Sequence, residues 1–285
     1  MQIEVKNVTK KYQTKYALEN VSFSLHEPKI YGLLGRNGAG KTTFMEILAG
    51  HQLATDGEVL VNGKSPFDNR EVVKEICLIK EADNFNKDMR IHQIIKACSL
   101  LYPKWDQQLA DELLKEYKLN GKARVKTLSK GMSSALGVIV GLASKAAITI
   151  FDEPYIGMDA AARRKFYDIL LEEYEEEKRT IIFSTHLIDE VSLLFEEVLI
   201  LQEGKLILQE TADTLRDKTC AVTGEIEEVK KFICNKKVMK TKQLANVMTA
   251  YIYGDREEAN QSNLQVEGIP IQDLMIYLTE TERGA

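Results

Sequence analysis

At residues 35–42 the sequence reads GRNGAGKT, and this stretch decides the fold. It fits the phosphate-binding loop template, in which two glycines separated by four residues are followed by lysine and a hydroxyl residue. The apolar run 30–34 ahead of it predicts a buried strand, and the run 43–48 after it predicts the first turns of a helix. The template therefore lies in the strand–loop–helix context that it requires.

The residue types in this loop suit a bound triphosphate. Gly38 and Gly40 carry no side chain, so successive backbone N–H groups can converge on phosphate oxygens. Lys41 would reach the β- and γ-phosphates as a point charge, and the Thr42 hydroxyl would be a ligand of Mg²⁺. The alternative is a glycine-rich turn that binds nothing, and the lysine and threonine in register weigh against it.

Length and composition limit the classes of protein to consider. The chain has 285 residues, 44% of them apolar, which is enough for one large domain with a smaller attachment. Its net charge of −5 weighs against a dedicated nucleic-acid binder. The first residues lack the features of a secretion signal, and the uncharged stretch 131–144 is shorter than the ~20 residues that a bilayer requires. We therefore expect a cytoplasmic protein without a membrane span.

Two neighbouring carboxylates follow the apolar strand predicted at residues 147–151. Asp152 closes this strand, the position from which a P-loop enzyme holds Mg²⁺. Glu153 beside it is placed to take a proton from a water molecule attacking the γ-phosphate. Asp152 would thus hold the metal ion, and Glu153 would act as the general base.

A second anion site is predicted at residues 128–132, which read LSKGM just before a helix. Ser129 is a hydroxyl cap for that helix, and Gly131 permits close approach of a backbone or ligand.

The order of elements predicts an α/β fold. Residues 1–29 form an antiparallel β preface, and a hairpin at 57–64 turns at Asn62 and Gly63. A central strand is expected at 75–79 and a helical insert at about 86–145. Further on, the pattern predicts a helix at 160–178, a strand at 180–184 and a hairpin at 197–201 and 205–208.

After about residue 216 the pattern changes, so we expect a main domain at 1–216 and a small accessory α/β domain at 217–285. Its strands are predicted at 219–223, 249–253 and 264–266, and its helices at 227–233 and 271–278.

The chain resembles the ATP-binding-cassette (ABC) ATPases, in which the loop 35–42 is the Walker A motif and the stretch 128–132 is the signature. Residues 148–152 followed by Glu153 match Walker B, Asp159 matches the D-loop, and His186 matches the switch histidine. The five motifs occur in the expected order over about residues 1–215. The resemblance implies a P-loop NTPase fold with an antiparallel β subdomain, a mostly parallel core sheet, an inserted helical subdomain and a C-terminal extension.

The resemblance also implies a head-to-tail dimer, with each ATP between the Walker A loop of one subunit and the signature of the other. Glu153, His186 and Lys41 would be catalytic, and Thr42, Glu81 and Asp152 would bind Mg²⁺. The expected ATP contacts are Tyr12, Gly35, Asn37, Gly38, Ala39, Gly40, Lys41, Thr42, Thr43, Ser129, Gly131 and Asp159. Tyr16 competes with Tyr12 as the aromatic residue that stacks on adenine.

Two positions depart from the family pattern. Glu81 stands where the family usually has glutamine, which adds negative charge near the metal. Lys130 and Met132 stand where the commonest signature has glycine and glutamine, although Ser129 and Gly131 are retained.

The expected function is that of the ATP-hydrolysing subunit of an ABC transporter of the bacterial exporter type, similar to multidrug, peptide or antibiotic-resistance exporters. Its partners would be a separate transmembrane permease subunit, contacted through residues 84–90, and a second ATP-binding subunit, identical or related. It would lie on the cytoplasmic face of the membrane, with no nucleic acid expected. The alternative is a soluble ABC ATPase acting on a ribosome or DNA. That alternative fits less well, because the chain has a single Walker A motif and lacks a long coiled coil.

Overall fold

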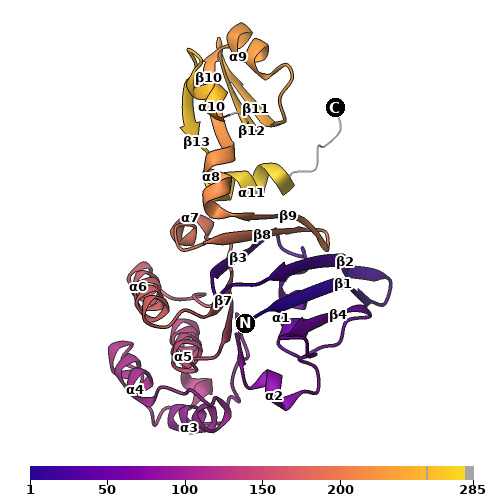
Figure 1. The fold of residues 1–285 in the computed structure, drawn as a ribbon. Coiled ribbons are helices and arrows are strands. Elements are labelled where there is room, and N and C mark those ends of the chain that lie inside the picture. Colours follow the sequence, from indigo (N-terminus) through magenta and orange to yellow (C-terminus); the bar gives the residue numbers. More distant parts are fainter. Residues whose placement is uncertain (255, 280–285) are drawn as a thin grey trace.

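The phosphate-binding loop lies between β3 (Ile30–Leu34) and α1 (Lys41–Leu48), in the context that the sequence predicts. A computed structural model of the chain describes residues 1–254 and 256–279. Residue 255 and residues 280–285, which belong to the expected domain 217–285, lie outside the described part. Figure 1 shows the α/β architecture, with the helices of the first half and the C-terminal sheet at opposite ends of the molecule.

β3 lies inside a six-stranded sheet with the order β5-β6-β7-β3-β8-β9. All neighbours in this sheet are parallel except β8 and β9, which form the predicted hairpin. The other strands are β5 (Ile76–Ile79), β6 (Ile148–Asp152), β7 (Thr180–Ser184), β8 (Glu197–Gln202) and β9 (Lys205–Thr211). Because parallel strands present their carboxyl ends at one edge, the ends of β3 and β6 face the same side as the loop.

The prediction of a central strand at 75–79 is wrong, because β5 is at the edge of the sheet and, among the described residues, pairs with β6 alone. Its apolar run has another cause. Ile76, Cys77 and Ile79 are buried, and α5 (Lys130–Ala143) packs against the strand. An edge strand covered on its faces carries the same apolar pattern as a central one.

A second, antiparallel sheet has the order β2-β1-β4, from β1 (Ile3–Tyr12), β2 (Lys15–Leu25) and β4 (Asp56–Val61). The Asn62–Gly63 turn is present, with positive φ at both residues. The hairpin predicted around it is wrong, because in the part of the chain that the structure describes Lys64 belongs to no strand and is joined to Val61 by an isolated bridge. β4 pairs with β1 instead.

Helices cover the parallel sheet and build the insert. The insert contains α3 (Ile91–Leu101), α4 (Gln107–Glu116), the 3₁₀ turn Val125–Thr127 and α5. α2 (Arg70–Val73) precedes it, and α6 (Ala160–Glu176) and α7 (Ile188–Val191) follow. The sequence prediction of a helix at 160–178 agrees with α6 to within its last residues.

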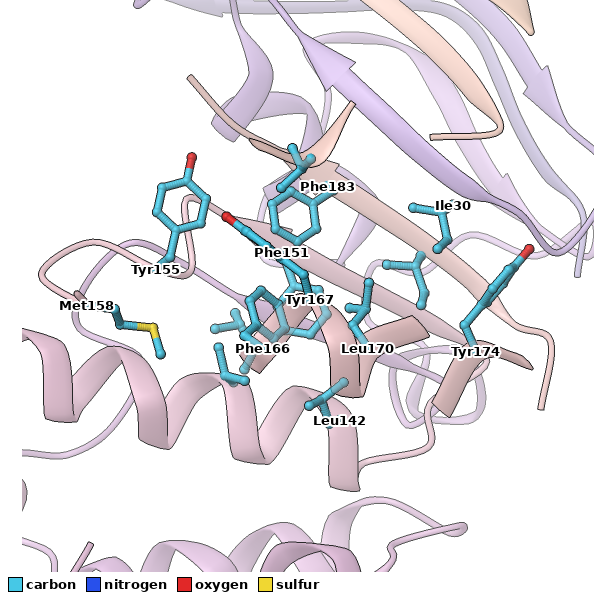
Figure 2. Close-up of a cluster of buried hydrophobic side chains, with 14 of the residues drawn as sticks. Ile30, Leu142, Phe151, Tyr155, Met158, Phe166, Tyr167, Leu170, Tyr174 and Phe183 are labelled. Carbon is cyan, nitrogen blue, oxygen red and sulfur yellow. The ribbon is translucent and has the colours of Figure 1, made fainter. Parts of the chain in front are cut away.

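A cluster of aromatic side chains joins β6, β7 and α6 (Figure 2). Phe151, Phe166 and Phe183 are fully buried, and the Phe166 ring centroid lies 5.3 Å from that of Phe151 and 5.8 Å from that of Phe183. Tyr155 and Tyr167 extend the same cluster. The segments that follow β6 and β7 are therefore anchored by one packed group of rings.

The C-terminal part forms an antiparallel sheet in the order β11-β12-β10-β13. Its elements are α8 (Ala212–Lys218), β10 (Thr219–Glu225), α9 (Ile226–Ile233), β11 (Val238–Leu244), β12 (Val247–Tyr253), α10 (Arg256–Asn260), β13 (Gln265–Gly268) and α11 (Ile271–Thr279). α11 contacts α7. The division of the chain into domains 1–216 and 217–285 stays a prediction.

Among residues 1–254 and 256–279, every helix is too short or too polar to cross a bilayer.

We predict that Phe166→Ala lowers the free energy of unfolding by about 3–5 kcal/mol, because it leaves a cavity between three neighbouring rings. Leu193→Ala, at a side chain that is 84% exposed, is the control and should change it by less than about 0.5 kcal/mol. Urea unfolding of both variants tests this, and equal midpoints would contradict the packing.

Candidate functional site

The phosphate-binding loop forms one wall of a cavity of about 460 Å³ at the carboxyl ends of the parallel strands. Side chains and backbone from four separate segments of the chain meet there. The cavity is lined by Tyr12, Lys15, Ala17, Asn37, Gly38, Ala39, Gly40, Lys41, Thr42, Thr43, Glu81, Asp152 and Glu153. The structure thus brings most of the sequence-predicted site residues to one place.

Lys41 is the buried cation of the cavity, with 9% of its surface exposed. Its Nζ donates to the backbone oxygen of Gly35 at 2.7 Å, which curls the loop around the ammonium group. Burial lowers the pKa of Lys41, and the charges of Glu153 and Asp152 oppose that shift. An anion entering the cavity would relieve the cost of burying this charge.

Gly40 is required by the geometry of the loop. Its φ of 104° lies in the region that side chains rarely adopt, and a Cβ there would lie 2.3 Å from the backbone oxygen of Ala17. The residue before α1 can therefore only be glycine, and residues 41–43 of the first helical turn line the cavity.

Thr42 and Asp152 place two oxygens side by side. The Thr42 hydroxyl donates to Asp152 Oδ2 at 2.7 Å, which joins the start of α1 to the end of β6. Burial raises the pKa of Asp152, and the bond from Thr42 and the charge of Lys41 oppose the shift. Glu81 lines the same cavity. A hydroxyl and carboxylates are ligands that Mg²⁺ accepts, so these residues fit that cation.

The protein supplies only part of a coordination shell. In the described residues there is no group of three or more His, Cys, Asp or Glu side chains that could hold a metal. A cation at Thr42 and Asp152 would therefore need further oxygens from a bound ligand or water, as is usual for Mg²⁺.

Glu153 is fixed by three contacts. Its backbone has a φ of 50°, unusual for a residue other than glycine, and its N–H donates to the oxygen of Ser184 at 3.1 Å. The ring of His186 contacts its Oε2 at 2.6 Å through Nδ1. Because an ionised carboxylate only accepts, that nitrogen carries the hydrogen.

Tyr155 makes the third contact, since its hydroxyl donates to Glu153 Oε2 at 2.6 Å. Tyr155 is not among the site residues predicted from the sequence. It reads as an ordinary aromatic two positions after the glutamate, and only the hydrogen bond shows its connection to the site.

Tyr12 and Tyr16, the two candidates for stacking on adenine, differ in their position relative to the cavity. Tyr12 lines the cavity, and its hydroxyl donates to Gln52 at 2.6 Å. Tyr16 is equally exposed but does not line the cavity. Each ring faces a neighbouring lysine, Lys10 at Tyr12 and Lys11 at Tyr16. An aromatic ring at position 12 is therefore available for a planar ligand group.

Ser129, Gly131 and Asp159 are not brought to the cavity. Ser129 caps α5 by accepting from Met132 N–H at 3.2 Å, and it lines a separate hollow of about 480 Å³. Asp159 caps α6 by accepting from Ala162 N–H at 2.8 Å. Glu81 borders both hollows, and its carboxylate lies 3.5 Å from Lys130 Nζ.

Gly131 lies against Gly157, backbone to backbone. A Cβ on Gly131 would be 2.3 Å from the oxygen of Gly157, and a Cβ on Gly157 would be 2.9 Å from the nitrogen of Gly131. The segments that start α5 and α6 therefore touch where neither has a side chain.

Comparison with known proteins identifies relatives of this chain. A family model described as ABC transporter matches residues 18–156. The chain is 35% identical over 197 residues to the uncharacterized ABC transporter ATP-binding protein MJ1023 of Methanocaldococcus jannaschii, covering 67% of this chain and 71% of the relative. It is 27% identical over 189 residues to the ABC transporter ATP-binding protein YtrB of Bacillus subtilis, covering 66% of this chain and 65% of YtrB.

The fold has counterparts among solved structures. A structure described as the dimeric structure of MJ0796, a bacterial ABC transporter cassette, superposes with a TM-score of 0.65 at 24% identity. The match covers 74% of this chain and 98% of that chain. The predicted α/β cassette fold is confirmed.

We predict that Asp152→Asn stabilises the ligand-free protein at pH 7. Because burial raises the pKa of Asp152 above its unfolded value, the ionised carboxylate costs stability at neutral pH. That cost disappears as the pH falls and the carboxyl group is protonated, so the advantage of the variant should shrink toward acid pH. Thermal unfolding across pH measures it, with the exposed Asp168→Asn as control. A lower midpoint for Asp152→Asn at pH 7 would contradict the prediction.

Proposed function

The chain belongs to the ABC transporter family of ATP-binding proteins, and on that premise we propose that it is an ATP-hydrolysing subunit that powers transport through a separate transmembrane subunit. One observation carries the proposal. The cavity gathers the buried cation Lys41, the oxygens of Thr42 and Asp152, and the carboxylate Glu153 held by His186, as ATP hydrolysis requires.

The residues divide the work as follows. The loop 35–42 and Lys41 bind the phosphates, and Tyr12 stacks on the adenine. Thr42 and Asp152, with Glu81 near, would hold Mg²⁺, which would neutralise charge on the phosphates. Glu153 takes a proton from water, the hydroxide formed attacks the γ-phosphorus, and ADP leaves with the bridging oxygen. His186 keeps the glutamate in place and lies beside the γ-phosphate.

The site on one chain is half of a working site. Ser129, Gly131 and Asp159 lie away from the cavity of their own chain, which supports a head-to-tail dimer in which they reach the ATP of a second subunit. The described dimer of a similar cassette is in keeping with this arrangement. The charge of the γ-phosphate then favours closure of the two subunits around ATP, and hydrolysis lets the subunits separate.

The transport partner is a transmembrane permease on whose cytoplasmic side the chain is bound. Residues 84–90 of the insert are the proposed contact surface. The direction is export, which the lysine-containing signature supports. The second ATP-binding subunit is a copy of this chain or a related one.

The decisive experiment is Glu153→Gln. Removing the base should lower the ATPase rate by about 100-fold or more, while ATP and Mg²⁺ still bind and hold the chain as a dimer. Hydrolysis assays and size-exclusion chromatography with ATP measure both effects. Glu176→Gln, on the exposed face of α6, is the matched control and should behave as the parent. A Glu153→Gln protein that hydrolyses ATP at the parental rate would refute the role of this residue.

Glu81→Gln tests the first departure from the family pattern. Glu81 lines the cavity and its charge raises the pKa of Asp152, so it adds to the negative potential at the proposed metal position. We expect the Mg²⁺ concentration for half-maximal ATPase activity to rise about threefold to tenfold, with little change at saturating Mg²⁺. Asp83→Asn, an exposed neighbour paired with Lys87, is the control. An unchanged Mg²⁺ dependence would remove any role of Glu81 in metal binding.

A further inference from the structure

Tyr155 is a buried residue whose hydroxyl reaches the proposed catalytic base. Its side chain is 2% exposed, and its ring stacks on Phe183 with centroids 6.3 Å apart and an interplanar angle of 16°. Figure 2 shows it at one end of the aromatic cluster, with the hydroxyl pointing away from Phe166 and Leu170. The packed ring therefore fixes where the hydroxyl lies.

The hydroxyl belongs to a chain of hydrogen bonds with a single possible direction. The backbone N–H of Leu187 donates to Thr185 Oγ1 at 2.8 Å, Thr185 bonds to the Tyr155 hydroxyl, and Tyr155 bonds to Glu153 Oε2. An amide only donates and an ionised carboxylate only accepts. Thr185 therefore donates to Tyr155, and Tyr155 donates to Glu153. These three hydrogen bonds anchor the Glu153 carboxylate to the backbone that follows β7.

Both donors to Glu153 reach the same oxygen. Tyr155 and His186 each lie 2.6 Å from Oε2, and within residues 1–254 and 256–279 no side chain donates to Oε1. One oxygen is thus used to hold the group, and the other keeps its lone pairs for a ligand in the cavity that Glu153 lines.

We propose that Tyr155 is a positioning residue for ATP hydrolysis, because its hydroxyl fixes Glu153 Oε2 and so aims Oε1 at the attacking water. The proposal rests on the proposed function. His186 is 59% exposed at its side chain, whereas Tyr155 is locked in the core, so Tyr155 is the rigid member of the pair that holds the carboxylate.

Tyr155→Phe tests the proposal, since it removes the hydroxyl and keeps the ring. We expect kcat for ATP hydrolysis to fall about 10-fold, because a base that is free to rotate is aligned less often. KM for ATP and ATP-dependent dimer formation should stay within about twofold of the parent, since the phosphate-binding residues are untouched.

The chain offers a matched control in Tyr167→Phe. Tyr167 lies in the same aromatic cluster, is also buried, and its hydroxyl has no hydrogen-bond partner in the described residues. This variant removes a buried tyrosine hydroxyl without touching Glu153, so its kcat should equal that of the parent. A purely structural role of Tyr155 would lower stability without this selective loss of kcat.

A second variant keeps the test decisive if Tyr155→Phe folds poorly. Thr185→Val breaks the link that orients the Tyr155 hydroxyl, and it should lower kcat about threefold, again with KM unchanged. Parental kcat in both variants, or equal losses in Tyr155→Phe and Tyr167→Phe, would overturn the proposal. The proposed function fails separately, if the parent does not hydrolyse ATP or if Glu153→Gln remains active.

Discussion

The burial of one cation beside two carboxylates is the constraint on which the rest of the structure depends. Lys41 is taken out of water at the start of α1, and Asp152 and Glu153 are held near it at the end of β6. Burial shifts the pKa of Lys41 down and that of Asp152 up, so each group is held in a setting that disfavours its charge. The parallel sheet makes this arrangement possible, because it brings the ends of separate strands to one edge.

The packed aromatic cluster makes the carboxyl ends of these strands, where the polar site residues lie, rigid. Phe151 and Phe183 belong to the two strands that carry Asp152 and His186 toward the cavity, and Phe166 ties both strands to α6. Tyr155 extends the cluster and ends in a hydroxyl at Glu153. The apolar core and the reactive carboxylate are therefore parts of one continuous structure, and the φ of 50° at Glu153 is maintained by these contacts.

The sequence allowed the loop, the parallel strands and most of the cavity to be predicted, because each depends on a local pattern of glycines, apolar runs and strand-end carboxylates. The position of β5 at the sheet edge could not be predicted, since burial by helices gives edge and central strands the same apolar run. β11 was not predicted, because its middle residues 240–243 are polar and its last four residues are exposed, so it shows no apolar alternation. Tyr155 was missed because its importance lies in the direction of one hydroxyl, which depends on the packing of distant rings.

The contact between Gly131 and Gly157 fixes the distance between the start of α5 and the segment that leads into α6. Ser129 and Asp159, which cap these helices, flank the contact. The distance between the two caps is therefore set by two backbones that are already in contact and have no room for a side chain between them. A molecule that meets this surface encounters both caps at a fixed separation. Only glycine is tolerated at these two positions, although neither residue contributes a side chain to any reaction.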